Sequence, residues 1–249
     1  MTKFRPKVYK PDINYGHYPN EGKEFKKYDL YTMTKRRKFE ELTQVAPDIW
    51  IKDFSLDKAF CKKLIGRYEE EVLITARDVQ GVEKVKPGVV GGGPDGTVTV
   101  MKEIKDSSDY IINNNNDSWK QDDKLLYEEL FSNSSALTKE LQSIRSDNAT
   151  WFDYDKPYQI QKTVPGGKYV WHTEAGPGTI DRTLTFMWYL NDDYKDGNTG
   201  FVRQGVEIEA KTGRLVLFSP YWTHIHSGLP VEEGEKYIIT GWVHMQLPE

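Results

Sequence analysis

Thr183-Leu184-Thr185-Phe186-Met187-Trp188-Tyr189-Leu190 is rich in β-branched and aromatic residues. Such side chains pack well on a pleated surface, so this stretch favours a strand. Other short β-rich runs, separated by turn signals, follow Trp151 in the same part of the chain. They are Tyr158–Thr163, Tyr169–Trp171, Val206–Ile208, Leu215–Phe218 and Tyr237–Val243. Many short strands at close spacing predict a sandwich, barrel or jelly roll rather than a parallel α/β sheet.

The chain before Trp151 has helical spacing instead. A short strand signal at Asp48–Ile51 precedes a helix that is expected to begin at an N-cap on Ser55. Two short helical patterns follow, over residues 125–130 and 137–144, and Ser132–Ser135 separates them and can supply the second cap. The expected architecture is therefore helices first and a β-barrel second.

Two irregular stretches interrupt these elements. Pro87–Gly96 predicts a loop that leads into a strand over Thr97–Met101, and Asn113–Asp117 is rich in asparagine. The glycine pattern matches neither of the common phosphate-binding loops. The two stretches are expected either to form a lid over the barrel mouth or to be merely disordered, and the sequence leaves both possibilities open.

Charge is unevenly distributed along the chain. The net charge is −4, yet residues 1–40 contain eleven Lys/Arg and five Asp/Glu, so they carry +6 and the remainder carries −10. Residues 1–45 lack periodicity and are predicted to be an extended basic leader, with Lys35–Lys38 as its densest part. A solvated leader is preferred over an arm for an anionic partner, so a nucleic-acid partner is not expected.

The single cysteine, Cys61, excludes an intrachain disulfide, and its apolar-periodic surroundings predict that it is buried. The sequence has no apolar signal segment at its N-terminus, and no run approaches the ~20 apolar residues of a membrane span. We therefore expect a cytoplasmic protein with no membrane partner.

His172-Thr173-Glu174 is a candidate metal motif. Residues i and i+2 of a strand point to the same face, so one strand end can present both an imidazole and a carboxylate. A third ligand must come from elsewhere, and residues 222–226 offer His224 and His226. Two histidines and one carboxylate with open positions are the donors of non-heme Fe(II) oxygenases, although His-x-Glu alone is more often a surface pair. His17 and His244 invite no site.

Lys236 strengthens this interpretation. It stands ten residues after His226 and directly before Tyr237–Trp242, which predicts a buried strand. A buried cation needs an anionic partner, and a dicarboxylate co-substrate would supply one through a charge-assisted hydrogen bond.

Residues from Tyr158 to Val243 resemble the 2-oxoglutarate/Fe(II) dioxygenase superfamily, specifically its prolyl 4-hydroxylase-like branch. Residues Ile49–Arg67 show a weaker similarity to the same branch. Four motifs in the family's order carry the resemblance. They are Gly166–Glu174, Arg182–Thr185 with Tyr189-Leu190-Asn191, Gly197–Phe201, and His226–Lys236.

The resemblance implies a mainly β protein with flanking helices. Its core is expected to be a double-stranded β-helix of jelly-roll type, with the N-terminal helices packed on one sheet. A single oxygenase domain is expected over residues 46–249, with helical support over 55–145 and the β-helix core over 150–245.

The resemblance also implies site residues. His172, Glu174 and His226 would hold iron, and Lys236 would pair with the distal carboxylate of 2-oxoglutarate, assisted by Thr199. His226 is preferred over His224 because only His226 has a basic residue ten positions later. His224 is then either a contact to the site or substrate, or a packed residue.

Two positions depart from the family pattern. Where the family usually has an aspartate, this chain has Glu174. Glutamate is still a hard oxygen ligand, but its extra methylene shifts the metal or requires another rotamer. A tyrosine that often contacts 2-oxoglutarate aligns with Thr163, which leaves that side of the co-substrate pocket less defined. An alanine or glycine in place of the carboxylate would have indicated a halogenase, and Glu174 argues against one.

The implied cofactors are Fe(II) and the co-substrate 2-oxoglutarate, with ascorbate as a possible reductant. The implied reaction hydroxylates a C–H bond with O₂ while 2-oxoglutarate is decarboxylated to succinate, and its expected substrate is a prolyl residue in a peptide or protein. The alternatives are the same chemistry on a free amino acid or other small molecule, and a non-catalytic, cupin-like metal-binding module. Nucleobase dealkylation is disfavoured by Lys236.

Overall fold

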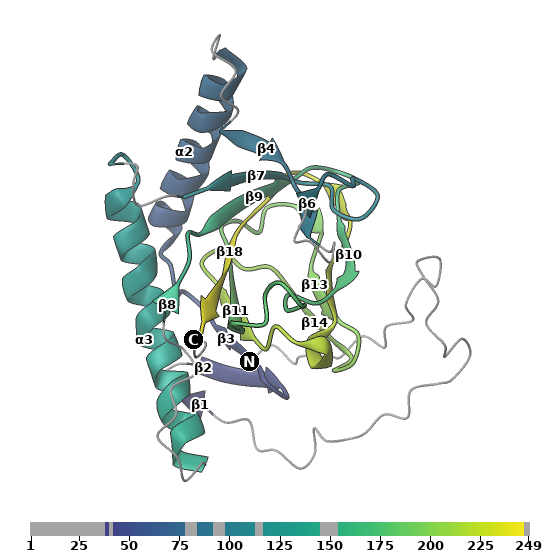
Figure 1. Cartoon of the computed structure of the whole chain (residues 1–249). Helices are drawn as coiled ribbons and strands as arrows, with labels where there is room; N and C mark the ends of the chain where they lie inside the picture. Colours follow the sequence, from purple (N-terminus) through teal and green to yellow (C-terminus); the bar gives the residue numbers. More distant parts are fainter. Residues whose placement is uncertain are drawn as a thin grey trace, which may run out of the picture.

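The computed structural model describes residues 38–39, 42–77, 84–91, 98–112, 117–144 and 154–246. Two long helices stand beside a barrel of strands (Figure 1). The helices are α2 (Lys58–Arg77) and α3 (Lys120–Ile144), and η1 (Trp222–His224) is a single 3₁₀ turn. The strands are β1 (Lys38–Phe39), β2 (Leu42–Ala46), β3 (Ile49–Lys52), β4 (Val85–Pro87), β5 (Val90–Gly91), β6 (Val98–Thr99), β7 (Ser108–Ile111), β8 (Tyr154–Asp155), β9 (Gln159–Thr163), β10 (Tyr169–His172), β11 (Arg182–Tyr189), β12 (Lys195–Asp196), β13 (Thr199–Phe201), β14 (Val206–Ile208), β15 (Leu215–Phe218), β16 (His226–Gly228), β17 (Val231–Glu233) and β18 (Lys236–His244).

Two antiparallel sheets form the barrel. The larger sheet has the order β1-β2-β3-β15-β11-β18-β9-β7-β4, with β8 paired to β18. The smaller sheet has the order β10-β16-β13-β14. Two short pairs, β12–β17 and β5–β6, complete the described strands. The sequence therefore predicted the strand-rich C-terminal part correctly.

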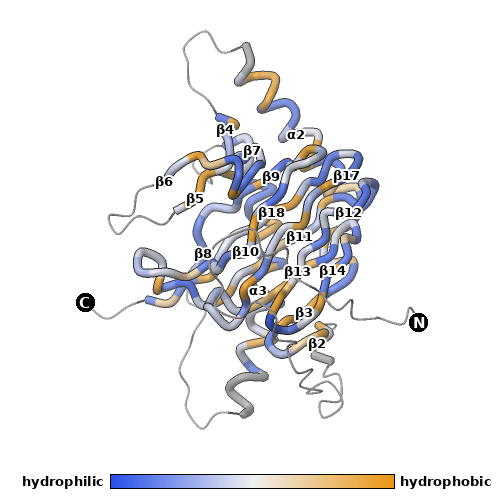
Figure 2. Tube along the Cα trace, turned by 90° about the vertical axis from the view of Figure 1, so that its right-hand side faces the viewer, coloured by the Kyte–Doolittle hydropathy of each residue, from blue (hydrophilic) through white to orange (hydrophobic). Residues whose placement is uncertain are grey.

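The central strands β11 and β18 are buried on both faces, because two different cores lie against them. Phe186 and Trp188 belong to a core shared with both helices, whereas Met187 and Tyr189 belong to a core shared with the smaller sheet. Apolar positions therefore recur along β11 and β18 (Figure 2). The expectation that the N-terminal helices pack on one sheet is confirmed.

Helix α2 begins later than predicted. The carboxylate of Asp57, not Ser55, accepts a hydrogen bond from the backbone N–H of Phe60 (2.8 Å). Ser55 instead donates to Glu129 Oε1 (2.7 Å) and accepts from Trp188 Nε1 (3.0 Å). Serine and aspartate are both good N-caps, and the tertiary contacts of Ser55 decide between them.

Helix α3 is continuous, so the expected break at Ser132–Ser135 was wrong. Asn133 Nδ2 donates to the backbone carbonyl of Glu129 (2.7 Å), and Ser134 Oγ donates to that of Phe131 (3.2 Å). Short polar side chains can bond the carbonyls of the preceding turn, and they are then accommodated within a helix.

Other expectations for the N-terminal half are met in part. The predicted leader lies mostly outside the described residues, but its last part forms β2, which pairs with β3. The strand expected over Thr97–Met101 is limited to β6, which pairs with β5. Residues 113–116 of the asparagine-rich stretch lie outside the described residues. Cys61 is buried, as predicted, and burial raises the pKa of its thiol to about 12.

Among the described residues, neither helix is apolar enough over a sufficient length to cross a membrane.

The packing of α3 generates a stability prediction. Leu126 is fully buried in the helix–sheet core, whereas its neighbour Leu125 is 43% exposed. We expect Leu126→Ala to lower the free energy of unfolding by about 2–5 kcal/mol, because it leaves a cavity, and Leu125→Ala to lower it by less than about 1 kcal/mol. Equal losses in urea denaturation would contradict this packing of α3.

Candidate active site

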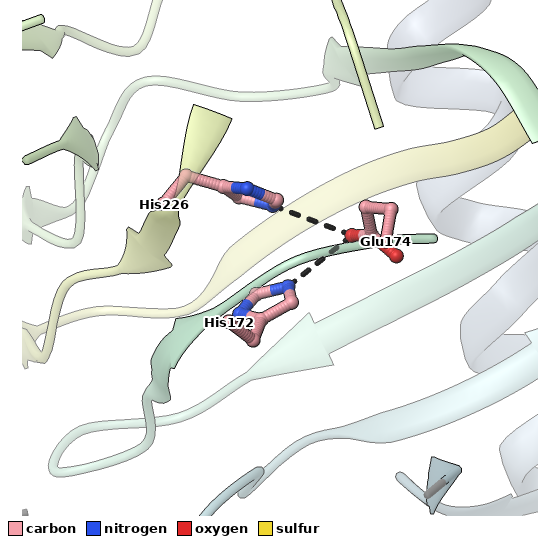
Figure 3. A group of neighbouring side chains, drawn as sticks. All are labelled: His172, Glu174 and His226. Carbon is pink, nitrogen blue, oxygen red and sulfur yellow. Dashed lines mark hydrogen bonds and ion pairs between the residues drawn. The ribbon is translucent and has the colours of Figure 1, made fainter. Parts of the chain in front are cut away.

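The two candidate histidine ligands face each other across one strand pair. His172 ends β10 and His226 begins β16, and the two residues are direct partners in the antiparallel register. Directly opposite residues of such a pair have adjacent side chains. The imidazole centroids are 4.2 Å apart, and both rings point toward Glu174 (Figure 3).

Backbone carbonyls fix the tautomer of both imidazoles. His172 Nδ1 lies 2.7 Å from the carbonyl oxygen of Val170, and His226 Nδ1 lies 3.0 Å from that of His224. A carbonyl oxygen only accepts hydrogen bonds, so each Nδ1 carries a proton. Each Nε2 then faces Glu174, and it is the ring nitrogen that binds a metal once it is unprotonated.

Glu174 lies just beyond the end of β10. Its backbone N–H and that of Ala175 both donate to the carbonyl of Pro220 (3.0 and 2.9 Å). Its Oε1 is 3.2 Å from His172 Nε2 and 3.3 Å from His226 Nε2. The ligand atoms of all three residues lie within 4.8 Å of one another.

Aromatic rings hold the two imidazoles in place. Tyr169 stacks on His172 with centroids 3.5 Å apart, and Phe218 packs edge-on against His226 at 4.7 Å. Burial, followed by the proximity of His226, lowers the pKa of His172. Burial alone would raise the pKa of Glu174, but hydrogen bonds with the two histidines outweigh it and hold that pKa well below the usual range.

Lys236 begins β18 inside the barrel. Its side chain is 4% exposed, and Nζ donates to the carbonyl of Gly197 (2.6 Å), in a turn where Asp196 and Gly197 both have positive φ. No carboxylate pairs with Lys236 within the described part of the chain. Burial therefore lowers the pKa of Lys236 to about 8.

Thr199 and Thr163 lie near this lysine. Thr163 is the direct partner of Lys236 in the β9–β18 register. Thr199 is buried and accepts a hydrogen bond from the hydroxyl of Tyr189 (2.7 Å). Thr199 Oγ1 also donates to Met187 Sδ (3.9 Å). A thioether sulfur is a weak acceptor, so a ligand carboxylate could take its place.

All of the predicted site residues except His224 line a single cavity of about 640 Å³. Lys105 also lines this cavity, and it forms a buried ion pair with Asp109 (2.6 Å). Val89 and Gly91 of the glycine-rich loop also line the cavity, as does Val98 in the strand β6 that follows the loop. Residues 92–97 lie outside the described residues, so the lid stays a prediction.

The structure resolves the alternatives for His224, and it places His244 outside the cavity. His224 is buried, and its Nε2 lies 3.1 Å from the carbonyl of Pro47 in the β2–β3 turn, so it is a packed residue outside the cavity. His244 stacks on Tyr154, and its Nδ1 lies 2.8 Å from Asp181. His17 lies outside the described residues.

The cavity fits Fe(II) and 2-oxoglutarate. The Nε2 atoms of the two imidazoles and Oε1 of Glu174 face one another. Such a donor set suits a divalent transition metal. The buried ammonium of Lys236 in the same cavity suits one carboxylate of a dicarboxylate. Fe(II) would be held by His172, Glu174 and His226, and 2-oxoglutarate by Lys236 with Thr199.

Comparison with known families agrees with this fit. Residues 158–244 match the family model described as the 2OG-Fe(II) oxygenase superfamily. These residues, here termed the oxygenase segment, are similar to that superfamily. The oxygenase segment contains each of the four motifs, and the superfamily is defined by its use of Fe(II) and 2-oxoglutarate.

Two curated relatives of the oxygenase segment are prolyl 4-hydroxylases by name. A putative prolyl 4-hydroxylase of Acanthamoeba polyphaga mimivirus is 35% identical over 69 residues, which cover 24% of this chain and 28% of the relative. Probable prolyl 4-hydroxylase 9 of Arabidopsis thaliana is 26% identical over 121 residues, which cover 37% and 42%. The chain thus spans less than half the length of either relative.

Solved structures share the fold. A Trichoplax adhaerens prolyl hydroxylase, in complex with a hypoxia inducible factor peptide fragment, has a TM-score of 0.60 at 17% identity, covering 79% of this chain and 83% of its own. A Pseudomonas putida prolyl-4-hydroxylase has a TM-score of 0.58 at 15% identity, covering 80% and 94%. The expected double-stranded β-helix is therefore confirmed.

Sequence reasoning assigned no role to three residues that bear on the site. Tyr189 donates to Thr199, Trp242 Nε1 donates to Glu174 Oε2 (3.1 Å), and Arg182 Nη1 donates to the carbonyl of Glu174 (2.6 Å). Arg182 and Tyr189 belong to motifs that carry the family resemblance, and Trp242 lies in the strand predicted over Tyr237–Val243. Their contacts with the site depend on how distant strands pair.

The depressed pKa of Lys236 generates a pH prediction. A lysine with a pKa near 8 is mostly charged at pH 7 and mostly neutral at pH 9. Because only the charged form attracts a carboxylate, the Kd for 2-oxoglutarate should rise about tenfold between these pH values. Calorimetric titration of the Mn(II)-saturated protein with 2-oxoglutarate measures this change.

Lys236→Arg is the matched control, because a guanidinium keeps its charge throughout this pH range. Its Kd for 2-oxoglutarate should vary little between pH 7 and 9. A wild-type Kd that is equally flat would show that Lys236 does not bind the co-substrate.

Proposed function

We propose that the protein is an Fe(II)- and 2-oxoglutarate-dependent dioxygenase that hydroxylates a prolyl residue in a peptide or protein. One observation carries the proposal: the donors of His172, Glu174 and His226 converge in the same cavity as the buried Lys236. A metal-binding module without catalytic activity gives no reason for a buried ammonium that lacks a carboxylate partner among the described residues.

The residues that line the cavity would have separate roles in this reaction. Fe(II) and 2-oxoglutarate, when bound, supply the oxygen-activating chemistry, in which the co-substrate is decarboxylated to succinate and a C–H bond is hydroxylated. His172, Glu174 and His226 would hold the metal with three protein donors, which would leave room for the co-substrate and O₂. Lys236 and Thr199 would anchor the far end of the co-substrate and so fix its orientation.

The cavity wall would keep bulk water from the reacting groups. Tyr169 and Phe218 cover the imidazoles from two sides, and the carbonyls of Val170 and His224 hold their protons on Nδ1. Neither imidazole can then turn without losing a hydrogen bond, so the site is preorganised for the metal.

The names of the relatives and the exposed apolar surface beside the cavity support a polypeptide substrate. Val89 and Val98 line the cavity and are also 37% and 63% exposed, so apolar surface extends from the cavity to the outside. Exposed apolar surface at a mouth is typical of sites that bind a longer partner. The matching relatives are prolyl 4-hydroxylases by name.

Turnover of 2-oxoglutarate tests the chemistry. We expect the iron-loaded protein to form succinate under air. In His172→Ala or His226→Ala the rate of succinate formation should fall to that of free Fe(II) without protein. His224→Ala is the control, because His224 packs on Pro47 outside the cavity, and its rate should stay within about tenfold of the wild type. Circular dichroism checks that each variant folds.

Loss of succinate formation in His224→Ala, with His226→Ala active, would reverse the choice of the third ligand. A mass gain of one oxygen atom then identifies the substrate in a screen of proline-containing peptides and free amino acids. Oxygen transfer to free amino acids alone would replace the peptide substrate by a small molecule.

A further inference from the structure

The two oxygen atoms of the Glu174 carboxylate have different surroundings. Oε1 faces the two candidate histidine ligands at 3.2 and 3.3 Å. Oε2 faces the opposite way and accepts a hydrogen bond from the indole Nε1 of Trp242 (3.1 Å). The carboxylate therefore has one oxygen for the metal and one that the protein already occupies.

Trp242 is itself held against this carboxylate. The guanidinium of Arg182 lies 3.5 Å above the indole ring, and its Nη1 is 3.6 Å from Glu174 Oε2. The same Nη1 donates to the backbone carbonyl of Glu174 (2.6 Å). Because Arg182 contacts both the ring and the glutamate, the indole N–H has little freedom to turn away from Oε2.

The position of Trp242 follows from strand pairing. Trp242 lies on β18 directly opposite Thr185 of β11, in the same pair of strands that brings Arg182 opposite His244. Glu174 lies on the loop after β10 and is tied by its backbone to Pro220. Three separate parts of the chain thus fix the backbone and one oxygen of a single carboxylate.

We propose that Trp242 is a positioning residue that makes Glu174 a one-oxygen metal ligand, by holding Oε2 away from the metal. This inference rests on the proposed function. A glutamate is longer than the aspartate usual in the family, so its carboxylate has more rotamers and more ways to miss or chelate the metal. The indole N–H removes that freedom and leaves Oε1 as the ligand atom.

This role explains how the longer side chain fits the site. An aspartate is shorter by one methylene, about 1.5 Å, and its carboxylate cannot meet both the metal position and the indole N–H of this chain. Glu174 and Trp242 therefore form a matched pair. Hydrogen bonds that orient a metal ligand typically change metal affinity by about 10–100-fold.

Metal binding without turnover tests the pair. The metal-free protein and the variants Trp242→Phe, Glu174→Asp and the double variant are titrated calorimetrically with Co(II), which reports affinity independently of activity. We expect Trp242→Phe and Glu174→Asp each to raise the Kd at least about tenfold. In the Glu174→Asp protein the further change Trp242→Phe should have little effect, because the contact is already lost.

Trp222→Phe is the matched control, because Trp222 is 66% exposed and its indole has no contact with Glu174 among the described residues. Its Kd for Co(II) should equal that of the wild type. Thermal unfolding of each metal-free variant distinguishes a lost contact from a lost fold.

Three results would overturn the inference. They are an unchanged Kd in Trp242→Phe, an equal loss from Trp242→Phe in the wild-type and the Glu174→Asp backgrounds, and wild-type affinity in Glu174→Asp. The last measurement decides the question even if Trp242→Phe does not fold. Absence of Co(II) binding by the wild type would instead contradict the proposed function itself.

Discussion

The structure depends on one electrostatic constraint: three electron-pair donors face a common point inside the barrel. His172 Nε2, His226 Nε2 and Glu174 Oε1 lie within 4.8 Å of one another, and the backbone carbonyls that accept from each Nδ1 direct both Nε2 lone pairs inward. Donors so arranged repel one another unless a cation or proton lies between them. The β10–β16 pairing and the contacts of Glu174 with Pro220 and Trp242 keep them in place despite this repulsion.

Apolar packing on both sides of the central strands offsets the free-energy cost of burying these polar groups. One core joins β11 and β18 to the helices, and the other joins them to the smaller sheet. Their stabilisation allows Lys236 to stay buried with no carboxylate partner among the described residues, a state that lowers its pKa to about 8. A ligand that supplies the missing negative charge would therefore stabilise the folded chain on binding.

The failures of sequence-based prediction have a common cause. Ser55 and Ser132–Ser135 are good helix caps by composition, yet Ser55 bonds Glu129 and Trp188, and the second group lies within α3. Local preference is a weak signal when a side chain finds a partner elsewhere in the fold or in the preceding helical turn. The strands were predicted well, because burial on one or both faces imposes a strong apolar pattern.

The sequence by itself determined the strand-rich architecture and offered the candidate ligands, because these follow from residue type and spacing along the chain. The preference for His226 came from the resemblance to the dioxygenase superfamily. Only the tertiary structure decided that His224 packs on Pro47 and that the hydroxyl of Tyr189 supports Thr199. It also decided that Trp242 occupies the second oxygen of Glu174, 68 residues away in the chain. The physical reason is that strand register and loop backbone set these contacts, and neither can be read from local spacing.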